Sequence, residues 1–192
     1  MRNRMMTAAL VLAVVAGLGI DAAAQGRGGG GRGGRGGGVI PPLLMETDAF
    51  EDGAIIPERY AGRGGNTQPG FTFSNIPAGT ASFAIIFHDL DVAFNGSDDV
   101  LHWMVWNIPA EAAGLPKGRL PEGAVSGTAG IGRGNYFGPG APAGPRYHHY
   151  VFELYALSAM LDLTTEATRD QLLDAMNDVI VGKAACVGRF RQ

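Results

Sequence analysis

Apolar runs of strand length, separated by glycine and proline, dominate the chain after residue 38. The four clearest runs are Phe71–Phe73, Ser82–Phe87, His102–Ile108 and Tyr147–Leu157. Turn residues bound these runs, and aromatic and β-branched residues fill them, which is typical of strands in an antiparallel sandwich. Because no helical stretch separates the runs, the crossover helices of a parallel sheet are not expected.

One helix is predicted near the C-terminus. Thr168 and Gln171 have the spacing of a capping box, in which each side chain bonds a free backbone N–H group of the first turn. The apolar residues that follow recur at helical spacing, namely Leu172, Leu173, Met176, Val179 and Ile180. Gly182 can end this helix, and a short last strand is expected from Val187 to Gln192. The chain is therefore predicted to be mainly β, a sandwich with one C-terminal helix.

The first 24 residues have the order of a signal peptide. Arg2 and Arg4 precede an apolar run from Ala8 to Ile20, and Ala22-Ala23-Ala24 supplies a small-residue cleavage site. The run is too short to span a bilayer, so export to the periplasm or the medium is expected, with no membrane span after cleavage. A retained membrane anchor is the alternative. No cysteine follows the run, so a lipid anchor is not expected.

Residues 25–38 are nearly all glycine and arginine, and they are predicted to form a flexible linker. Weak contact of this tract with anionic surfaces is the alternative. The rest of the chain, residues 39–192, is long enough for one compact domain. Five of the 15 basic residues but only one of the 18 acidic ones precede Val39, so the domain has a formal charge near −7. Nucleic acid is therefore not an expected partner, because binding it depends on Lys and Arg contacts to phosphate.

Polar residues gather where three predicted strands begin or end. His88-Asp89-Leu90-Asp91 follows one strand, His102 begins the next, and Tyr147-His148-His149-Tyr150 begins the longest one. Side chains alternate across a strand, so His148 and His149 must face opposite ways and only one of them can join a common site. His88 is expected to face solvent or to lie in a turn.

Three kinds of site can be built from these residues. In a binding pocket, imidazole and backbone N–H groups donate to an anion while Asp89 orients a histidine. A structural polar cluster is the second reading. A metal site is the third, because imidazole and carboxylate also bind zinc or iron. No Gly-x-Ser-x-Gly or His-Glu-x-x-His motif occurs, so no catalytic machinery is predicted and the protein is not expected to be an enzyme.

Several motifs in a fixed order resemble one known family. They are Asp89-Leu90-Asp91, His102-Trp103, the segment Gly138–Gly144, His148-His149-Tyr150-Val151-Phe152 and the closing Val187-Gly188-Arg189-Phe190. Each motif is weak alone. The ordered set is similar to the phosphatidylethanolamine-binding protein family, in its bacterial Raf-kinase-inhibitor-like branch, and the resemblance spans Met45 to Arg191.

The resemblance implies a two-sheet antiparallel sandwich with an anion pocket at one end. The pocket residues that it implies are Asp89, Asp91, His102, His148 and Tyr150. The implied ligand is a small anion such as phosphate or a phosphoethanolamine head group, with no metal and no cofactor. Two alternatives stay open. One is an inhibitor of an extracytoplasmic protease or another signalling partner, and the other is a metal-dependent enzyme that uses the same Asp and His residues.

The chain departs from the family pattern at the rim of this pocket. The family's Asp-Pro-Asp-Ala-Pro is replaced by Asp89-Leu90-Asp91-Val92-Ala93, which lacks both prolines, and the arginine expected after the first histidine is His149. Asp98-Asp99 adds acidic charge near the expected mouth. Arg133 and Tyr136 lie in a glycine-rich loop beside it, and such loops often line binding sites.

Overall fold

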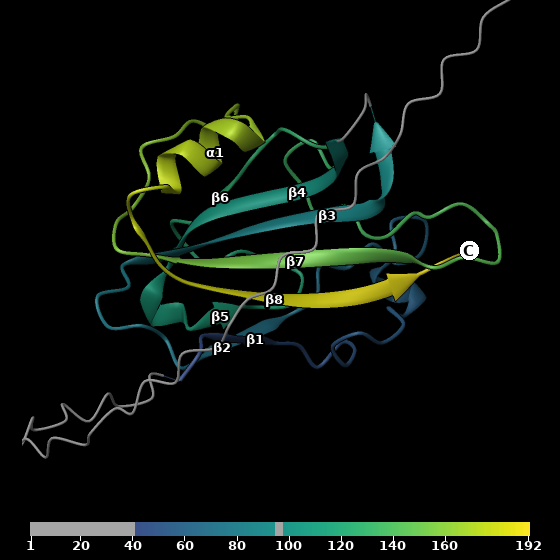
Figure 1. Ribbon diagram of the computed structural model, residues 1–192, viewed down its shortest axis with the longest axis horizontal. Coiled ribbons are helices and arrows are strands. Elements are labelled where there is room, and N and C mark those ends of the chain that lie inside the picture. Colours follow the sequence, from purple (N-terminus) through teal and green to yellow (C-terminus); the bar gives the residue numbers. More distant parts are fainter. Residues whose placement is uncertain (1–40, 95–97) are drawn as a thin grey trace, which may run out of the picture. The chain divides into compact units, whose positions relative to one another are not determined.

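The computed structural model describes residues 41–94 and 98–192, which form two antiparallel sheets (Figure 1). The larger sheet contains, in spatial order, β6 (Val125–Ser126), β4 (Asp98–Pro109), β3 (Ser82–Phe94), β7 (His148–Leu157) and β8 (Ile180–Phe190). The smaller sheet contains β1 (Leu44–Glu46), β2 (Phe71–Ser74) and β5 (Gly114–Leu115). The predicted signal peptide (1–24) and linker (25–38) lie outside the described residues.

Short helical elements lie in the connections. The 3₁₀ turns η1 (Glu58–Tyr60) and η2 (Ala110–Ala112) precede β2 and β5, and α1 (Arg169–Met176) connects β7 to β8. The capping box forms as predicted, because Gln171 N–H donates to Thr168 Oγ1 at 3.2 Å and Thr168 N–H donates to Gln171 Oε1 at 2.9 Å. Within the described ranges, no helix has the length and apolar character needed to cross a membrane.

The main core lies between the two sheets. The ring centroids of Phe73 in β2 and Phe83 in β3 are 4.8 Å apart, and those of Phe71 in β2 and Phe152 in β7 are 4.9 Å apart. Phe152 also stacks on Phe87 of β3 with a centroid separation of 3.9 Å. All five rings are buried, so their removal from water and their aromatic contacts hold the sheets together. The predicted two-sheet sandwich is confirmed.

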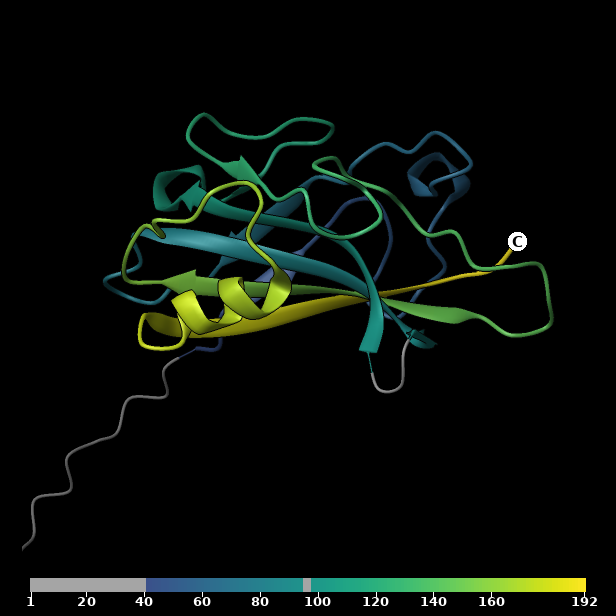
Figure 2. The same ribbon diagram turned by 90° about the horizontal axis from the view of Figure 1, so that it is seen from above.

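The outer face of the larger sheet is covered by α1 (Figure 2). Leu172 and Met176 are fully buried in one apolar cluster with Ile86 of β3 and Trp106 of β4. The central strands β3 and β4 of the larger sheet are therefore buried on both faces. This explains why its central strands appear in the sequence as continuous apolar runs rather than as alternating ones.

Two strands are longer than their sequence patterns predict. β3 continues through His88 to Phe94, so the polar residues after Phe87 lie in a strand and not in a loop. β8 begins at Ile180 and not at Val187, because it pairs with β7 from Leu157↔Ile180 to His148↔Phe190. The first half of β8 contains glycine, lysine and alanine, which have weak strand propensity, so pairing with β7 rather than local preference makes it a strand.

The helix is correspondingly shorter than predicted. α1 ends at Met176, so the expectation that Val179 and Ile180 continue its apolar face is wrong. Ser158 N–H donates to Val179 O at 2.8 Å, which ties this segment to the end of β7. Contact with the sheet therefore overrides the helical periodicity of the sequence.

His88 is buried at 4% exposure, so the expectation of a solvent-facing or turn histidine is wrong. Its Nδ1 bonds the carboxylate of Asp99, and Arg169 at the start of α1 bonds the same carboxylate. The pairing of β3 with β4 shifts register between Phe87 and His88. The charge of Asp99 is thus paired with Arg169 beside α1, instead of adding to the mouth of the predicted pocket.

Candidate functional site

Neighbouring strands of the larger sheet place four of the predicted residues around one pocket. Asp89 of β3 pairs in register with Tyr150 of β7 and with Val100 of β4. The pocket has a volume of about 240 Å³, and Asp89, His102, His148 and Tyr150 are its polar lining residues. Residues that lie far apart in the sequence meet here because β4, β3 and β7 are adjacent in the sheet.

Asp89 is the buried anchor of the pocket, with 3% of its surface exposed. One carboxylate oxygen, Oδ2, lies 2.8 Å from His148 Nδ1, and the other accepts the N–H of Asp91 at 2.9 Å. An ionised carboxylate only accepts hydrogen bonds, so His148 Nδ1 carries a proton. His148 Nε2 is therefore the ring nitrogen available to a ligand.

His102 is held in the same tautomer by a different partner. Its Nδ1 lies 2.8 Å from the carbonyl oxygen of Phe137, which also can only accept. Burial lowers the pKa of His102, and this effect outweighs the Phe137 carbonyl and the charge of Asp89, which both favour the protonated ring. At neutral pH the ring is mainly uncharged, and its Nε2 is a hydrogen-bond acceptor.

Tyr150 lies between the two histidines. Its ring is fully buried and meets the His102 ring edge-on, with centroids 5.3 Å apart, and stacks on the His148 ring at 6.4 Å. The hydroxyl oxygen accepts the N–H of Gly140 at 3.3 Å. Burial, helped by the charge of Asp89 and by a hydrogen bond to its carboxylate, raises the pKa of Tyr150 well above its ordinary value, so the phenol stays protonated.

Asp91 lies outside the pocket. Its Oδ2 accepts two bonds from His149, one from the backbone N–H at 2.6 Å and one from Nδ1 at 2.8 Å. Burial alone would raise the pKa of Asp91, but these bonds outweigh it and hold the pKa below its ordinary value. Of the paired histidines only His148 lines the pocket. The structure thus brings Asp89, His102, His148 and Tyr150 together and leaves Asp91 aside.

Sequence reasoning missed the apolar wall of the pocket, which consists of Val92, Val100, Ile131, Phe137, Ala141 and Pro142. The glycine-rich loop indicated the correct segment but not the correct residues. Ile131 and Phe137 line the pocket, whereas Arg133 is exposed and Tyr136 is buried with its hydroxyl donating to Tyr60 O at 2.9 Å. The polar end of the pocket therefore adjoins an apolar surface.

The sequence matches the family model described as phosphatidylethanolamine-binding protein over residues 46–191. The chain belongs to this family. A relative named UPF0098 protein from Methanothermobacter thermautotrophicus is 37% identical over 155 residues, which are 78% of this chain and 99% of the relative. LppC of Mycobacterium tuberculosis, named as a candidate lipoprotein, is 38% identical over 149 residues, which are 78% of this chain and 72% of LppC.

Two solved structures with this fold superpose well on the chain. CT736 of Chlamydia trachomatis, described as a candidate phosphatidylethanolamine-binding protein homologue, gives a TM-score of 0.71 with 29% identity, over 79% of this chain and 98% of that one. Escherichia coli YbcL, described as a new member of the mammalian family, gives a TM-score of 0.71 with 26% identity, over 79% of this chain and 99% of YbcL. The family and the fold that the motifs predicted are both confirmed.

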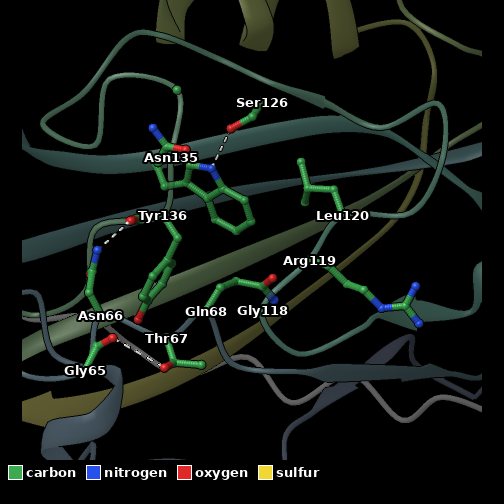
Figure 3. A pocket seen from close by; sticks show the side chains of 12 residues that line it. Gly65, Asn66, Thr67, Gln68, Gly118, Arg119, Leu120, Ser126, Asn135 and Tyr136 are labelled. Carbon is green, nitrogen blue, oxygen red and sulfur yellow. Dashed lines mark hydrogen bonds between the residues drawn. The ribbon is translucent and has the colours of Figure 1, made fainter.

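In this family member, Asn66 holds the loop that supports His102. Its Nδ2 donates to Tyr136 O at 3.2 Å and its Oδ1 accepts the N–H of Gly138 at 2.9 Å, as seen for the first bond in Figure 3. Phe137 lies between Tyr136 and Gly138, and its carbonyl oxygen accepts the hydrogen bond from His102 Nδ1–H. Asn66 therefore helps to fix the tautomer of His102 from the far side of the loop.

The chemistry available in the pocket follows from its free atoms. The two Nε2 atoms and the Tyr150 hydroxyl can exchange hydrogen bonds with one small polar group. Among the described residues that line the pocket there is no serine, threonine or cysteine, so none of these residues provides a nucleophile beside its histidines. In residues 41–94 and 98–192, no three His, Cys, Asp or Glu side chains gather closely enough to hold a metal ion.

Proposed function

We propose that the pocket of Asp89, His102, His148 and Tyr150 binds a small oxyanion, such as phosphate or the phosphate of a phospholipid head group. The single observation that carries this proposal is the convergence of two imidazoles whose Nδ1 atoms are already bonded within the protein. Each ring therefore has one nitrogen free, and in the protonated ring this nitrogen is a charged donor to an oxyanion.

The charge balance of the pocket determines how an anion is held. Asp89 places a buried negative charge there, and no Lys or Arg of residues 41–94 and 98–192 belongs to the lining. An oxyanion is therefore stabilised by imidazolium at His102 or His148, or by a proton that the ligand itself carries. Such a pocket suits one phosphate group and not a polyanion.

The apolar wall favours an organic phosphate over inorganic phosphate. Ile131 is 46% exposed at the edge of the pocket, and Phe137 and Pro142 extend the apolar surface. A head group that carries a hydrocarbon portion would cover this surface and gain roughly 25 cal/mol per Å² of apolar area removed from water. We therefore expect phosphoethanolamine derivatives with an alkyl chain to bind more tightly than phosphate.

We infer that the role of this pocket is binding and not catalysis, because none of the described residues that line it is a serine, threonine or cysteine. The proposed site of action is outside the cytoplasm. The signal-peptide pattern of residues 1–24 supports this location, and so does the similarity to LppC, whose name describes it as a candidate lipoprotein.

Titration of the domain with phosphate and phosphoethanolamine, followed by NMR of the histidine side chains, tests the proposal. Both ligands should shift the His102 and His148 resonances in a saturable way. His148→Gln should weaken binding by about tenfold or more, since it removes one of the two free Nε2 atoms of the pocket. His149→Gln is the matched control, because His149 is 49% exposed in its side chain and bonds Asp91 outside the pocket. Equal effects of the two variants, or shifts elsewhere only, would disprove the site.

A further inference from the structure

A second and larger hollow lies behind the loop that carries Phe137. It has a volume of about 600 Å³ and is bounded by the segment before β2, the segment after β5 and residues 134–136 (Figure 3). It shares no lining residue with the pocket described above. Of its lining side chains, Asn66 and the Tyr136 hydroxyl are occupied in holding the loop.

The hollow presents both hydrogen-bond acceptors and donors that have no partner in the described part of the chain. Gln68 is 6% exposed, and its amide nitrogen donates to Pro69 O while its Oε1 receives no bond. The side chain of Asn135 is exposed and makes no hydrogen bond to the protein. Ser126 Oγ accepts Trp103 Nε1–H at 2.7 Å, so its own proton is free to be donated.

The charge of the hollow is opposite to that of the domain. Arg119 is exposed at its edge, and no carboxylate among the described residues pairs with it. No acidic side chain in the part of the chain that the structure describes lines the hollow, although acidic residues outnumber basic ones in the chain by 18 to 15. A guanidinium group without a partner favours a carboxylate, which it can bind through two parallel hydrogen bonds.

The hollow also offers an apolar surface. Leu120 is half-buried there and provides this surface, while the rings of Trp103 and Tyr136, which meet edge-on with centroids 5.8 Å apart, are buried beneath it. A simple oxyanion would use Arg119 but would bring no donors for Gln68 Oε1 and no carbon to cover these groups. The complementary ligand therefore has a carboxylate, several hydroxyl groups and an apolar ring face.

We propose that this hollow is a second binding site, specific for a sugar acid such as a uronic-acid unit of an acidic polysaccharide. The carboxylate is bound by Arg119. The hydroxyl groups of the sugar donate to Gln68 Oε1, and the C–H face of the ring covers Leu120. This site is independent of the anion pocket, and its existence does not rest on the function proposed for that pocket.

Titration with sodium glucuronate, followed by ¹H–¹⁵N NMR of the domain, tests the proposal. We expect saturable shifts of the Gln68 side-chain amide and of the Trp103 indole N–H, with His102 and His148 unmoved. Glucose, which lacks the carboxylate, should bind about tenfold more weakly or worse. Inorganic phosphate, at concentrations that saturate the anion pocket, should not displace glucuronate from the hollow.

The variant Arg119→Gln removes the charge and keeps a polar side chain at an exposed position. It should weaken glucuronate binding by about tenfold while the rest of the spectrum stays unchanged. Arg133→Gln is the matched control, because Arg133 is also an exposed arginine and lies next to residues 134–136, but it does not line the hollow. Absence of shifts with glucuronate overturns the proposal. So does equal weakening by both variants, displacement by phosphate, or tighter binding of a peptide carboxylate such as acetyl-alanyl-alanine.

Discussion

His148 Nδ1 and Asp89 Oδ2 lie 2.8 Å apart although the two residues are 59 positions apart in the sequence. The bond joins β7 to β3 at the end of the sheet where the pocket opens. It occupies His148 Nδ1, so that Nε2 is the ring nitrogen left for a ligand. It also gives the buried Asp89 carboxylate a hydrogen-bond partner. The same bond therefore stabilises the fold and prepares the site.

The first prediction concerns this bond. Asp89→Asn should lower the free energy of unfolding by about 1–3 kcal/mol, because the charge-assisted bond to His148 is lost while the position remains buried. Urea denaturation at pH 7 measures the change. Asp91→Asn is the control: Asp91 is more exposed than Asp89, and its loss should cost less. A larger effect at Asp91 would contradict this account.

Stability should fall on acidification because of His102. Its folded-state pKa is below the ordinary 6.5, so below pH 6.5 the unfolded chain binds a proton that the folded protein does not. The contribution of neutral His102 to the free energy of unfolding is fully present above pH 6.5. It is lost as the pH falls from 6.5 toward the folded-state pKa, by at most about 1.4 kcal/mol per pH unit. In His102→Asn, the free energy of unfolding measured with urea should depend less on pH between pH 5 and 7. An unchanged pH dependence would refute the lowered pKa of His102.

Oxyanion binding should be coupled to proton uptake. His102 Nε2 accepts hydrogen bonds in the neutral ring and donates only in the protonated one, so bound phosphate favours protonation. Affinity should therefore rise as the pH is lowered through the histidine range. Calorimetry of phosphate binding in two buffers with different ionisation enthalpies measures the protons taken up. Binding without proton uptake and without pH dependence would show that the rings do not act as donors, even if phosphate binds.

The loop anchor can be tested at Asn66. Asn66→Ala removes both bonds to the Phe137 segment and should cost about 1–3 kcal/mol of stability. The ¹⁵N shifts of His102 should also report a mixture of tautomers. Asn75→Ala is a matched control, because Asn75 has a similar positive φ of 52° against 44° but makes one exposed bond, to Pro42 O. If both variants leave the His102 tautomer unchanged, the anchor does not act through Phe137.

A further test concerns the buried group beside α1. Arg169→Gln removes the partner of Asp99 and leaves the Asp99–His88 pair without its cation. We expect a loss of about 1–3 kcal/mol in the free energy of unfolding, measured with urea, because both neighbours are largely buried. Lys183→Gln should have a smaller effect, since Lys183 is exposed and pairs with Glu153 at the surface.

Local pattern was enough for several features of this protein. The apolar runs predicted the central strands, the Thr168–Gln171 spacing predicted the cap of α1, and strand alternation predicted that one of His148 and His149 would join a site. These features depend on residues close in sequence, where the geometry of the backbone itself sets the period. The ordered motifs added the family, and with it the two-sheet arrangement.

Only the tertiary structure decided which groups meet. β8 is long because β7 lies beside it, His88 is buried because Asp99 and Arg169 enclose it, and Asp91 is turned from the pocket by its two bonds to His149. The Phe137 carbonyl and Asn66, which set the state of His102, come from loops without a periodic signal. Contacts between distant segments depend on the packing of the whole domain, and a period of two or 3.6 residues carries no information about them.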